Sequence, residues 1–350
     1  MKFMLLLMSA AVLICSCSQV NEKKNADLPP EKKSDKPKVT PENFIRAETD
    51  KMFFAVVSPP NEGINKFYHF RTPTPLDLQR VVRMNKDVLY SSALVDTKNG
   101  AKVIFPKMPD KRYASILIID NDHYCSKVIY EPGEYDIPAD TRYMFMAVRI
   151  QLFNPKDSLE LAKVNKIQNE FKIIANSAEP FPEPQWDPVS LDSLHKVYEG
   201  EYSTYEKIPA DWMGPKGSVN EKNRHLACAG AWGLFPNQDA VYINYNGGNL
   251  PGNACYEATY KVPAVGAFWS ITVYGKDGFM KSENCIINMS NVKYNKDGTF
   301  TVHYGPAGTC PTNAKNRLDI TDGWNLLMRC YLPKQEVLSG AYKLPDVKKL

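Results

Sequence analysis

Beyond residue 17 the sequence lacks any apolar run long enough to cross a membrane as a helix. It also lacks the short motifs of several enzyme and binding classes: C-x-x-C, H-E-x-x-H, G-x-S-x-G, the P-loop and G-x-G-x-x-G are all absent. These absences remove most support for a zinc site, an α/β serine hydrolase and a nucleotide-binding domain. The five histidines stand singly, so we expect no metal site and no cofactor.

An excess of charge of either sign is missing as well. The chain has 43 Lys and Arg against 39 Asp and Glu, a formal net charge of +4. Lys2 contributes one positive charge, and residues 18–40, with six lysines and four acidic residues, contribute two more. The rest of the chain is therefore close to neutral and has no basic cluster, which argues against a nucleic-acid partner.

What the chain does have is a recognisable N-terminus. Lys2 is followed by a short apolar run over residues 3–14, and Ser16 precedes Cys17. This pattern predicts a bacterial lipoprotein signal with cleavage before Cys17 and acylation of that cysteine, palmitate being among the expected chains. An ordinary secretory signal and an uncleaved anchor are the alternatives. Because Ser18 rather than Asp follows Cys17, we expect the outer membrane, with the face left open.

Composition divides the chain into five parts. Residues 1–16 are the expected signal peptide, and residues 17–40, rich in Lys, Glu, Asp, Asn and Pro, are typical of a flexible polar tether. We expect an N-terminal domain over residues 41–180, a connection over residues 181–225 and a C-terminal domain over residues 226–350.

The N-terminal domain is expected to combine strands with two helices. Thr40 as N-cap, followed by a proline, predicts a helix over residues 41–57. Asp157 and Glu160 predict the start of a second helix. Its apolar stripe continues through Leu161, Val164, Ile167, Phe171 and Ile174. Strands are predicted over residues 103–105, 114–119 and 143–152.

The C-terminal domain is expected to be more purely β. An alternating run predicts a strand over residues 268–274, and another is predicted over residues 326–332. An Asn-Lys-Asp-Gly turn predicts a hairpin with arms at residues 292–294 and 299–304. Few helices and many antiparallel strands predict a mainly β fold with minor α+β character, made of two β-sandwich or jelly-roll-like domains.

Six of the eight cysteines lie in the expected folded body: Cys125, Cys228, Cys255, Cys285, Cys310 and Cys330. In an oxidising compartment we expect one or more disulfides among the five in the C-terminal half, with a connectivity that spacing cannot choose. The alternative is buried free thiols, since Cys285 and Cys330 lie within strand-like apolar runs.

Two sets of motifs resemble those of known families. Residues 85–91, Asn-Lys-Asp-Val-Leu-Tyr-Ser, preceded by Val82 and Arg83, resemble the N-R-D-T-L-Y-S signature of the N-terminal domain of unknown function catalogued as 1254. Residues 267–274, 327–333 and 340–342 are similar to the C-terminal domain of unknown function catalogued as 1214. The two domains normally occur in this order, and the resemblance implies a β-rich, jelly-roll-like architecture of two domains without implying an activity.

The first motif carries the best candidate site. Arg83, Asn85, Asp87 and Tyr90 place a guanidinium, an amide, a carboxylate and a phenol within a few residues, and an extended backbone would turn the first three to one side. Such a group can hydrogen-bond sugar hydroxyls or a carboxylated ligand. The structural alternative is a buried polar network that fixes a corner of a sheet, with Arg83 pairing Asp87.

Three functions are compatible with these residues. In the first, a polar ligand, with carbohydrate as the expected class, binds in a cleft between the two domains, where Asp239 and Tyr242 add contacts. In the second, the protein is a hydrolytic enzyme with Asp87 as acid or base and Tyr90 or His69 assisting. In the third, it is a structural envelope lipoprotein without a small ligand. The expected partners are the membrane, through the N-terminal lipid, and a glycan or other small polar ligand; an oligomer stays open.

Overall fold

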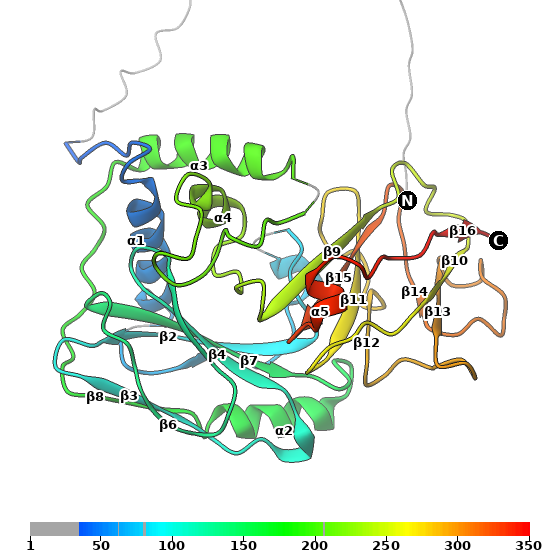
Figure 1. Ribbon diagram of the computed structural model, residues 1–350, viewed down its shortest axis with the longest axis horizontal. Helices are drawn as coiled ribbons and strands as arrows, with labels where there is room; N and C mark the ends of the chain where they lie inside the picture. The colour runs from blue at the N-terminus through cyan, green and yellow to red at the C-terminus, as the bar shows by residue number, and fades with distance from the viewer. Residues whose placement is uncertain (1–34, 62, 80–81, 206) are drawn as a thin grey trace, which may run out of the picture. The chain divides into compact units, whose positions relative to one another are not determined.

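A computed structural model of the chain is shown in Figure 1. It describes residues 35–61, 63–79, 82–205 and 207–350. The expected signal peptide, Cys17 and most of the polar tether therefore lie outside the described residues. Lys36–Leu350 is one compact unit. Across the described residues, no helix is both long and apolar enough to cross a membrane.

Two antiparallel sheets form the N-terminal half. Sheet A has the strand order β1-β2-β7-β4-β5, and sheet B has the order β6-β3-β8. The strands of sheet A are β1 (Tyr68–His69), β2 (Val88–Asp96), β4 (Ala114–Ile119), β5 (Cys125–Ile129) and β7 (Tyr143–Gln151). The strands of sheet B are β3 (Ala101–Phe105), β6 (Gly133–Asp136) and β8 (Lys172–Ala175). One apolar cluster joins both sheets and helix α2 (Ser158–Gln168), which lies with sheet B below sheet A in Figure 1.

Sheet A is buried on both faces. All residues of β4 and β7 are buried, which explains why their sequences are largely apolar instead of alternating; Ser115, Arg149 and Gln151 are the polar exceptions. The face away from sheet B is covered by α1 (Phe44–Val57), with α3 (Pro188–Tyr202) and α4 (Arg224–Gly230) packed against α1 (Figure 1).

The C-terminal half is a second pair of sheets. Sheet C has the order β12-β11-β15-β9, and sheet D has the order β14-β13-β10-β16. The strands of sheet C are β9 (Ala240–Asn246), β11 (Trp269–Tyr274), β12 (Ile286–Asn288) and β15 (Asn325–Tyr331). The strands of sheet D are β10 (Tyr256–Tyr260), β13 (Phe300–Tyr304), β14 (Arg317–Leu318) and β16 (Lys348–Lys349). Three short helices, η1 (Leu76–Leu78), η2 (Pro109–Lys111) and α5 (Gln335–Leu338), lie outside the sheets.

A shared apolar cluster joins the two halves. It contains Val88 and Tyr113 from the N-terminal half together with Phe268 and Tyr331 from the C-terminal half. The ring of Phe268 stacks on that of Tyr331, with centroids 4.4 Å apart, and lies 5.5 Å from the ring of Tyr113. Because each half completes the core of the other, the junction between them is a packed layer. We call this layer the junction.

Most of the expected architecture is confirmed. The fold is mainly β, with antiparallel sheets and few helices. The predicted strand at residues 114–119 is β4, and those at 268–274 and 326–332 are β11 and β15 to within one residue at each end. Asp157 is the N-cap of α2, where its side chain accepts a hydrogen bond from the backbone N–H of Leu159.

Two helix expectations need correction. The first helix begins at Phe44 rather than at residue 41, because the Asn43 side chain accepts a hydrogen bond from the Thr40 N–H (2.8 Å) and holds residues 40–43 in a turn. The second helix ends at Gln168, and Ile174 lies exposed in β8 instead of continuing the helical stripe. Residues 181–225 contain α3 and the start of α4, which the sequence patterns did not predict.

The expected hairpin at residues 292–304 is wrong in one arm. Its turn is present, since the Asn295 N–H donates to the Thr299 carbonyl (2.7 Å), but residues 292–294 form no strand. Strand β13 pairs along its full length with β10, which lies about forty residues earlier in the chain. The last two residues of β13 also pair with β14. A local turn signal does not reveal such a distant partner.

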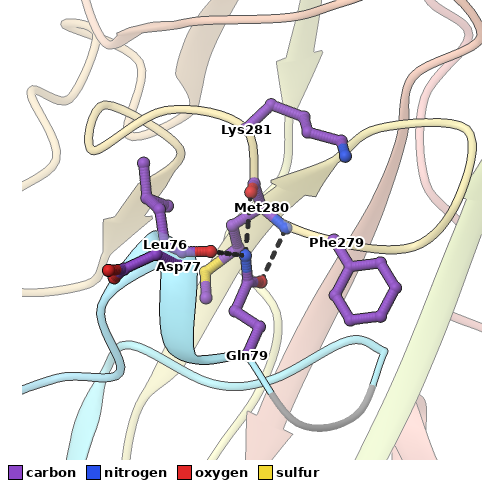
Figure 2. Close-up of a pocket in the computed structure, with 6 residues that line it drawn as sticks. All are labelled: Leu76, Asp77, Gln79, Phe279, Met280 and Lys281. Atoms are coloured by element: carbon purple, nitrogen blue, oxygen red, sulfur yellow. Dashed lines mark hydrogen bonds between the residues drawn. The ribbon is translucent and has the colours of Figure 1, made fainter.

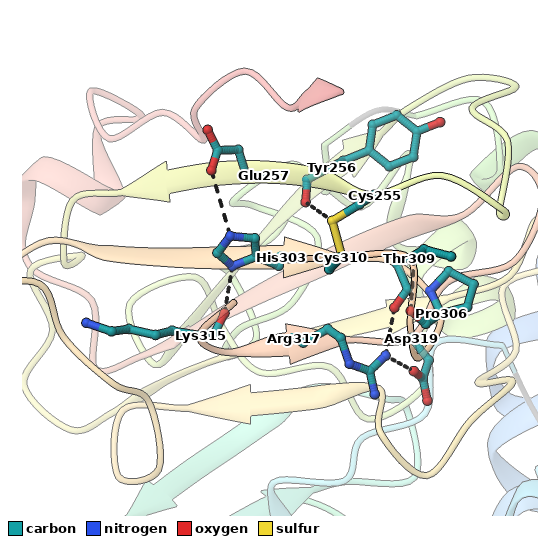
Figure 3. The surroundings of a disulfide bond; sticks show 11 residues. Cys255, Tyr256, Glu257, His303, Pro306, Thr309, Cys310, Lys315, Arg317 and Asp319 are labelled. Atoms are coloured by element: carbon teal, nitrogen blue, oxygen red, sulfur yellow. Dashed lines mark hydrogen bonds and ion pairs between the residues drawn. A yellow bond between two sulfur atoms is a disulfide. The ribbon is translucent and has the colours of Figure 1, made fainter. Parts of the chain in front are cut away.

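The cysteines divide between the two expected states. A disulfide joins Cys255, next to β10, to Cys310 in the loop between β13 and β14 (Figure 3), so the expected disulfide in the C-terminal half is confirmed. Among the described residues, the other four cysteines of the body are buried free thiols. Burial raises the pKa of Cys125 and of Cys330 to about 12, which keeps both thiols protonated and unreactive near neutral pH.

Candidate functional site

Sheet C has one apolar face and one polar face, and both are buried. The apolar face, with Trp269 and Met328, packs toward sheet D. The polar face carries side chains that are at most 6% exposed: Ser270, Thr272, Tyr274, Asn288, Asn325, Arg329 and Tyr331. A polar face removed from water must find hydrogen-bond partners, and the N-terminal half supplies them.

The partners come from the segment that the sequence singled out. Arg83 Nη1 donates to Asn244 Oδ1 on β9 (2.8 Å), and Asn85 Nδ2 donates to the Tyr331 hydroxyl on β15 (2.7 Å). Asp87 Oδ2 accepts a hydrogen bond from the Ser270 hydroxyl on β11. The structure therefore brings Arg83, Asn85 and Asp87 together against three neighbouring strands of sheet C.

The local backbone that achieves this differs from the expected strand. Arg83 has a φ of 55°, and Asn85 Oδ1 accepts a hydrogen bond from the Asp87 N–H (3.0 Å), so the segment turns before β2 begins at Val88. The expected pairing of Arg83 with Asp87 is not formed; the cation beside Asp87 is Arg329.

Asp87 is completely buried, with an exposed fraction of 0%. Its Oδ1 lies 3.4 Å from the Tyr331 hydroxyl, and its carbonyl accepts a hydrogen bond from the Leu152 N–H (2.8 Å). Burial raises the pKa of Asp87, while Arg329 and the hydrogen bonds from Ser270, Asn85 and Tyr331 act against the rise. A carboxyl with a raised pKa can serve as a hydrogen-bond donor or as an acid.

Arg329 is the central cation of the polar face. Its Nη2 donates to the Arg83 carbonyl (2.7 Å) and to the Tyr274 hydroxyl (2.8 Å), and its Nη1 donates to Thr272 Oγ1 (3.1 Å). The Tyr274 hydroxyl donates in turn to the Met84 carbonyl (2.8 Å). Arg329 thus fastens the turn at residues 83–84 to sheet C through neutral oxygens.

Sheet A contributes its own polar row to the junction. The register of β2, β7 and β4 places Tyr90, Arg149 and Ser115 side by side. Arg149 is 8% exposed; its Nη2 donates to the Gly233 carbonyl (3.1 Å), and its guanidinium carbon lies 4.0 Å from the ring centroid of Phe235. Its Nη1 has no hydrogen-bond partner among the described residues.

Four tyrosines act on Arg149, and they come from both halves of the molecule. Burial alone lowers the pKa of Arg149. Four tyrosines outweigh this effect and raise the pKa above its usual value, so the guanidinium remains charged; they are Tyr90, Tyr242, Tyr331 and Tyr113. Tyr90 and Tyr242 are only partly buried, while Tyr113 and Tyr331 are buried. The partly buried pair gives this cluster its solvent side.

The loop between α4 and β9 covers Arg149. Gly233, whose carbonyl accepts the hydrogen bond from Arg149, also donates its N–H to His123 Nε2 (3.1 Å). Burial and the nearby Arg224 lower the pKa of His123 to about 3, so the ring is neutral at ordinary pH and keeps an acceptor for Gly233. The ring of Trp232 stacks on that of His123, with centroids 5.5 Å apart.

Asp239 and Tyr242, predicted as ligand contacts, also lie at the junction. Asp239 Oδ1 accepts a hydrogen bond from the Tyr130 hydroxyl (2.5 Å); burial raises the pKa of Asp239, and this bond acts against the rise. Tyr242 is paired with Arg329 across β9 and β15, and burial raises its pKa to about 12.

His69 is not part of this site. It lies on β1, where its Nδ1 is 2.8 Å from the Ser91 hydroxyl, and Ser91 points to the face of β2 opposite to Tyr90 because side chains alternate along a strand. Burial and Arg71 lower the pKa of His69 to about 4. The structure therefore does not bring His69 to Asp87 or Tyr90.

Two open pockets lie apart from the junction cluster. The larger, of about 420 Å³, is lined by Leu76, Asp77, Gln79, Phe279, Met280 and Lys281 (Figure 2). Gln79 bridges its two sides: Nε2 donates to the Met280 carbonyl (2.9 Å) and Oε1 accepts from the Met280 N–H (2.8 Å). The smaller, of about 250 Å³, is lined by Asn61 and residues 67–71. Neither pocket is lined by Asp87 or Arg149.

Sequence reasoning missed the two buried arginines. Arg149 and Arg329 each stand inside an apolar run that becomes a fully buried strand. A permanent charge at such a position costs free energy unless the fold or a ligand compensates it. A single arginine within an otherwise apolar run was the sequence signal that could have identified each of these residues.

The comparisons with known families agree with the motifs. A family model described as "Protein of unknown function (DUF1254)" matches residues 64–131, and one described as "Protein of unknown function (DUF1214)" matches residues 240–335. The chain therefore carries a DUF1254 segment followed by a DUF1214 segment. Asp87 lies in the first matched segment and Arg329 in the second, so the junction is where the two segments meet. Arg149 lies in neither segment.

The fold is shared with a solved structure. The VPA0106 protein from Vibrio parahaemolyticus is similar with a TM-score of 0.68 at 16% identity, over 88% of this chain and 97% of that one. An uncharacterized protein from Burkholderia cenocepacia has a TM-score of 0.48 at 14% identity, over 88% of this chain and 86% of that one. No curated protein matches this chain. The likeness to the Vibrio protein concerns the fold alone.

Proposed function

We propose that the protein binds a small polar ligand at the junction between its two β halves. The observation that carries this proposal is the pair of buried arginines, Arg149 and Arg329, whose hydrogen bonds within the described residues all go to neutral oxygens. Buried guanidinium groups are costly, and proteins place such groups where charged or polar ligands are recognised.

Carbohydrate, the ligand class expected from the sequence, remains in the proposal. The side chains of Tyr90 and Tyr242 are only partly buried, and Asp87 and Asn85 supply a carboxyl and an amide at the same junction. Stacking on tryptophan is less available, because Trp212, Trp269 and Trp324 are fully buried in the apolar cores.

Hydrolysis with Asp87 as acid or base is a second candidate. The raised pKa of Asp87 favours it, since a carboxyl with a raised pKa keeps its proton to higher pH and is a better general acid. Both oxygens of Asp87, however, face protein hydroxyls, and the side chain is 0% exposed. This arrangement supports ligand positioning or structural support better than proton transfer to a substrate.

A thermal-shift screen of the full chain tests the proposal. Glycans, nucleotides, organic acids and divalent metals are the ligand classes, and a ligand at a hundredfold excess over its Kd stabilises the folded state by about 2.7 kcal/mol. We expect one class to raise the Tm, and Asp87→Asn to reduce that shift. Asp77→Asn, which removes an exposed carboxylate from the larger open pocket, is the matched control and should keep the shift.

The screen has two outcomes against the proposal. If no class raises the Tm while Asp87→Asn lowers it, the junction is structural and the protein is a structural envelope component. If the shift is lost in Asp77→Asn and kept in Asp87→Asn, the ligand binds in the open pocket instead.

We also propose that the protein is an outer-membrane lipoprotein anchored through Cys17. The lipobox-like residues 14–17 and the polar tether support this proposal. Labelling of cells with an alkyne-bearing palmitate should mark the wild-type chain and Cys15→Ala, but not Cys17→Ala. Equal labelling of the two variants contradicts the assignment.

A further inference from the structure

Arg149 is a buried cation of the junction whose hydrogen bonding is incomplete. Its Nη2 has one acceptor, the Gly233 carbonyl, while both N–H bonds of Nη1 lack a partner among the described residues. The adjacent Ser115 is 0% exposed, and its hydroxyl makes no hydrogen bond of ordinary geometry. The Tyr113 hydroxyl, near Ser115, also makes no hydrogen bond of ordinary geometry among the described residues, so three potential donors lie together beside β4 and β7.

The charges of the junction are also unbalanced at Arg149. Asp87 and Arg329 each act on the pKa of the other, so that pair is compensated internally. Asp239 is hydrogen-bonded to Tyr130. Among the described residues Arg149 forms no ion pair with a carboxylate, and the groups that act most strongly on it are tyrosines.

We propose that Arg149 binds the carboxylate of a small organic acid, with Ser115 as a second donor. This inference rests on the proposed function and names the chemistry of its ligand. One carboxylate carries one negative charge and accepts from the two N–H bonds of Nη1, which matches the missing charge and the missing acceptors together. A phosphate dianion would bring a second negative charge close to Asp87 and Asp239, so a carboxylate fits better.

Two tyrosines beside Arg149 are available to the body of the acid. Phe235 and the Gly233 backbone cover one side of Arg149. The other side of Arg149 faces Tyr90 and Tyr242, which are only partly buried. The ring centroid of Tyr90 lies 5.4 Å from the guanidinium carbon. An acid with an apolar ring face, such as an aromatic acid or a sugar acid, can therefore place its ring against these tyrosines.

Calorimetric titration of the full chain distinguishes this site from the wider proposal. The carboxylate probes are galacturonate and benzoate, their uncharged partners are galactose and benzamide, and inorganic phosphate is a second oxyanion. We expect one carboxylate to bind about tenfold or more tightly than its uncharged partner, because a charged hydrogen-bonded pair contributes about that factor or more. Arg149→Gln should lose this advantage, and Ser115→Ala should weaken binding about threefold.

Two other arginines provide matched controls. Arg71→Gln removes the same charge from the smaller open pocket and should leave the affinity unchanged. Arg112 is buried to 3% exposure and is paired through both terminal nitrogens with Glu160 (2.6 and 3.0 Å). Arg112→Gln should lower the Tm, since it leaves a buried carboxylate unpaired, whereas Arg149→Gln should leave the Tm equal to or above that of the wild type.

The outcomes separate the two proposals. If galactose or benzamide binds as tightly as its charged partner, and Arg149→Gln and Ser115→Ala bind it equally well, the carboxylate site is wrong while a polar-ligand site at the junction stands. Tighter binding of phosphate than of either carboxylate also overturns the inference. A Tm loss in Arg149→Gln as large as in Arg112→Gln, with no carboxylate preference in the wild type, assigns Arg149 a structural role.

Discussion

At the scale of single residues, the two ends of β2 show how burial alone does not decide the pKa of a carboxyl. Asp87 precedes the strand and Asp96 ends it, and both are 0% exposed. Burial raises the pKa of Asp87 because its partners do not outweigh desolvation. Burial also raises the pKa of Asp96, but its hydrogen bonds outweigh this effect and lower the pKa to about 2. They come from Arg142 and from the N–H groups of Glu179 and Lys98.

These opposite shifts predict opposite pH dependences. Asp87, with a folded pKa above its unfolded value of about 4, stabilises the fold below that value and loses this contribution as the pH rises through its folded pKa. The asparagine of Asp87→Asn does not titrate. The Tm of this variant should therefore rise relative to the wild-type Tm as the pH is raised from 4 to 8. Thermal unfolding at several pH values measures the difference, and a difference that stays flat contradicts the raised pKa.

Asp96→Asn should behave in the reverse way. The low folded pKa of Asp96 stabilises the fold above about pH 4, and this contribution disappears as the pH falls toward 2. The substitution should therefore cost about 1–2 kcal/mol at pH 7 and progressively less below pH 4. An unchanged cost at pH 2.5 would show that the hydrogen bonds of Asp96 do not favour its charged form.

Residue-scale reasoning from the sequence found part of the site. Arg83, Asn85 and Asp87 are close in the chain, so a motif exposes them together, and the structure places all three on sheet C. Arg149 and Arg329 belong to distant strands, and only the pairing of those strands into sheets A and C brings both to the junction. Whether they are ligand groups is a proposal that the screens above test.

At the scale of secondary-structure elements, prediction succeeded where the signal was local. The runs that became β4, β11 and β15 carry their own β-branched and aromatic residues, and Asp157 caps α2 from the neighbouring position. The partner of β13 was mispredicted because a turn at residues 295–298 competes with a longer, more complete pairing to β10. Pairing between elements depends on burial across the whole sheet, which a short window does not contain.

The disulfide acts at this same scale, because it ties β10 to the loop that follows β13 (Figure 3). It closes a loop of 55 residues, and closing such a loop in the unfolded chain stabilises the fold by about 2–4 kcal/mol. Chemical unfolding with and without reductant should show a loss of this size. The double variant Cys255→Ala, Cys310→Ala should show the same loss and no response to reductant. A reductant effect that persists in the variant would place the sensitive bond elsewhere.

At the scale of the whole molecule, the junction makes the two halves depend on each other. Phe268 and Tyr331 pack against Tyr113, and the polar face of sheet C is satisfied by residues that precede β2. Separation of the halves would expose an apolar cluster and leave buried polar groups such as Arg329 and Asp87 without partners. The free energy of the junction therefore favours one folding unit over two.

This dependence predicts cooperative unfolding of the full chain. Calorimetry should give one transition, with equal calorimetric and van't Hoff enthalpies. Phe171→Ala in the core of sheets A and B and Phe300→Ala in the core of sheets C and D remove rings of equal size, at a cost of about 3–5 kcal/mol each. Either substitution should lower the hydrogen-exchange protection of β4 and β11 together, because the half that is not mutated loses its partner at the junction. If Phe300→Ala lowers protection in β11 and leaves β4 unchanged, the halves are separate folding units, and a ligand at the junction would link two independently stable domains.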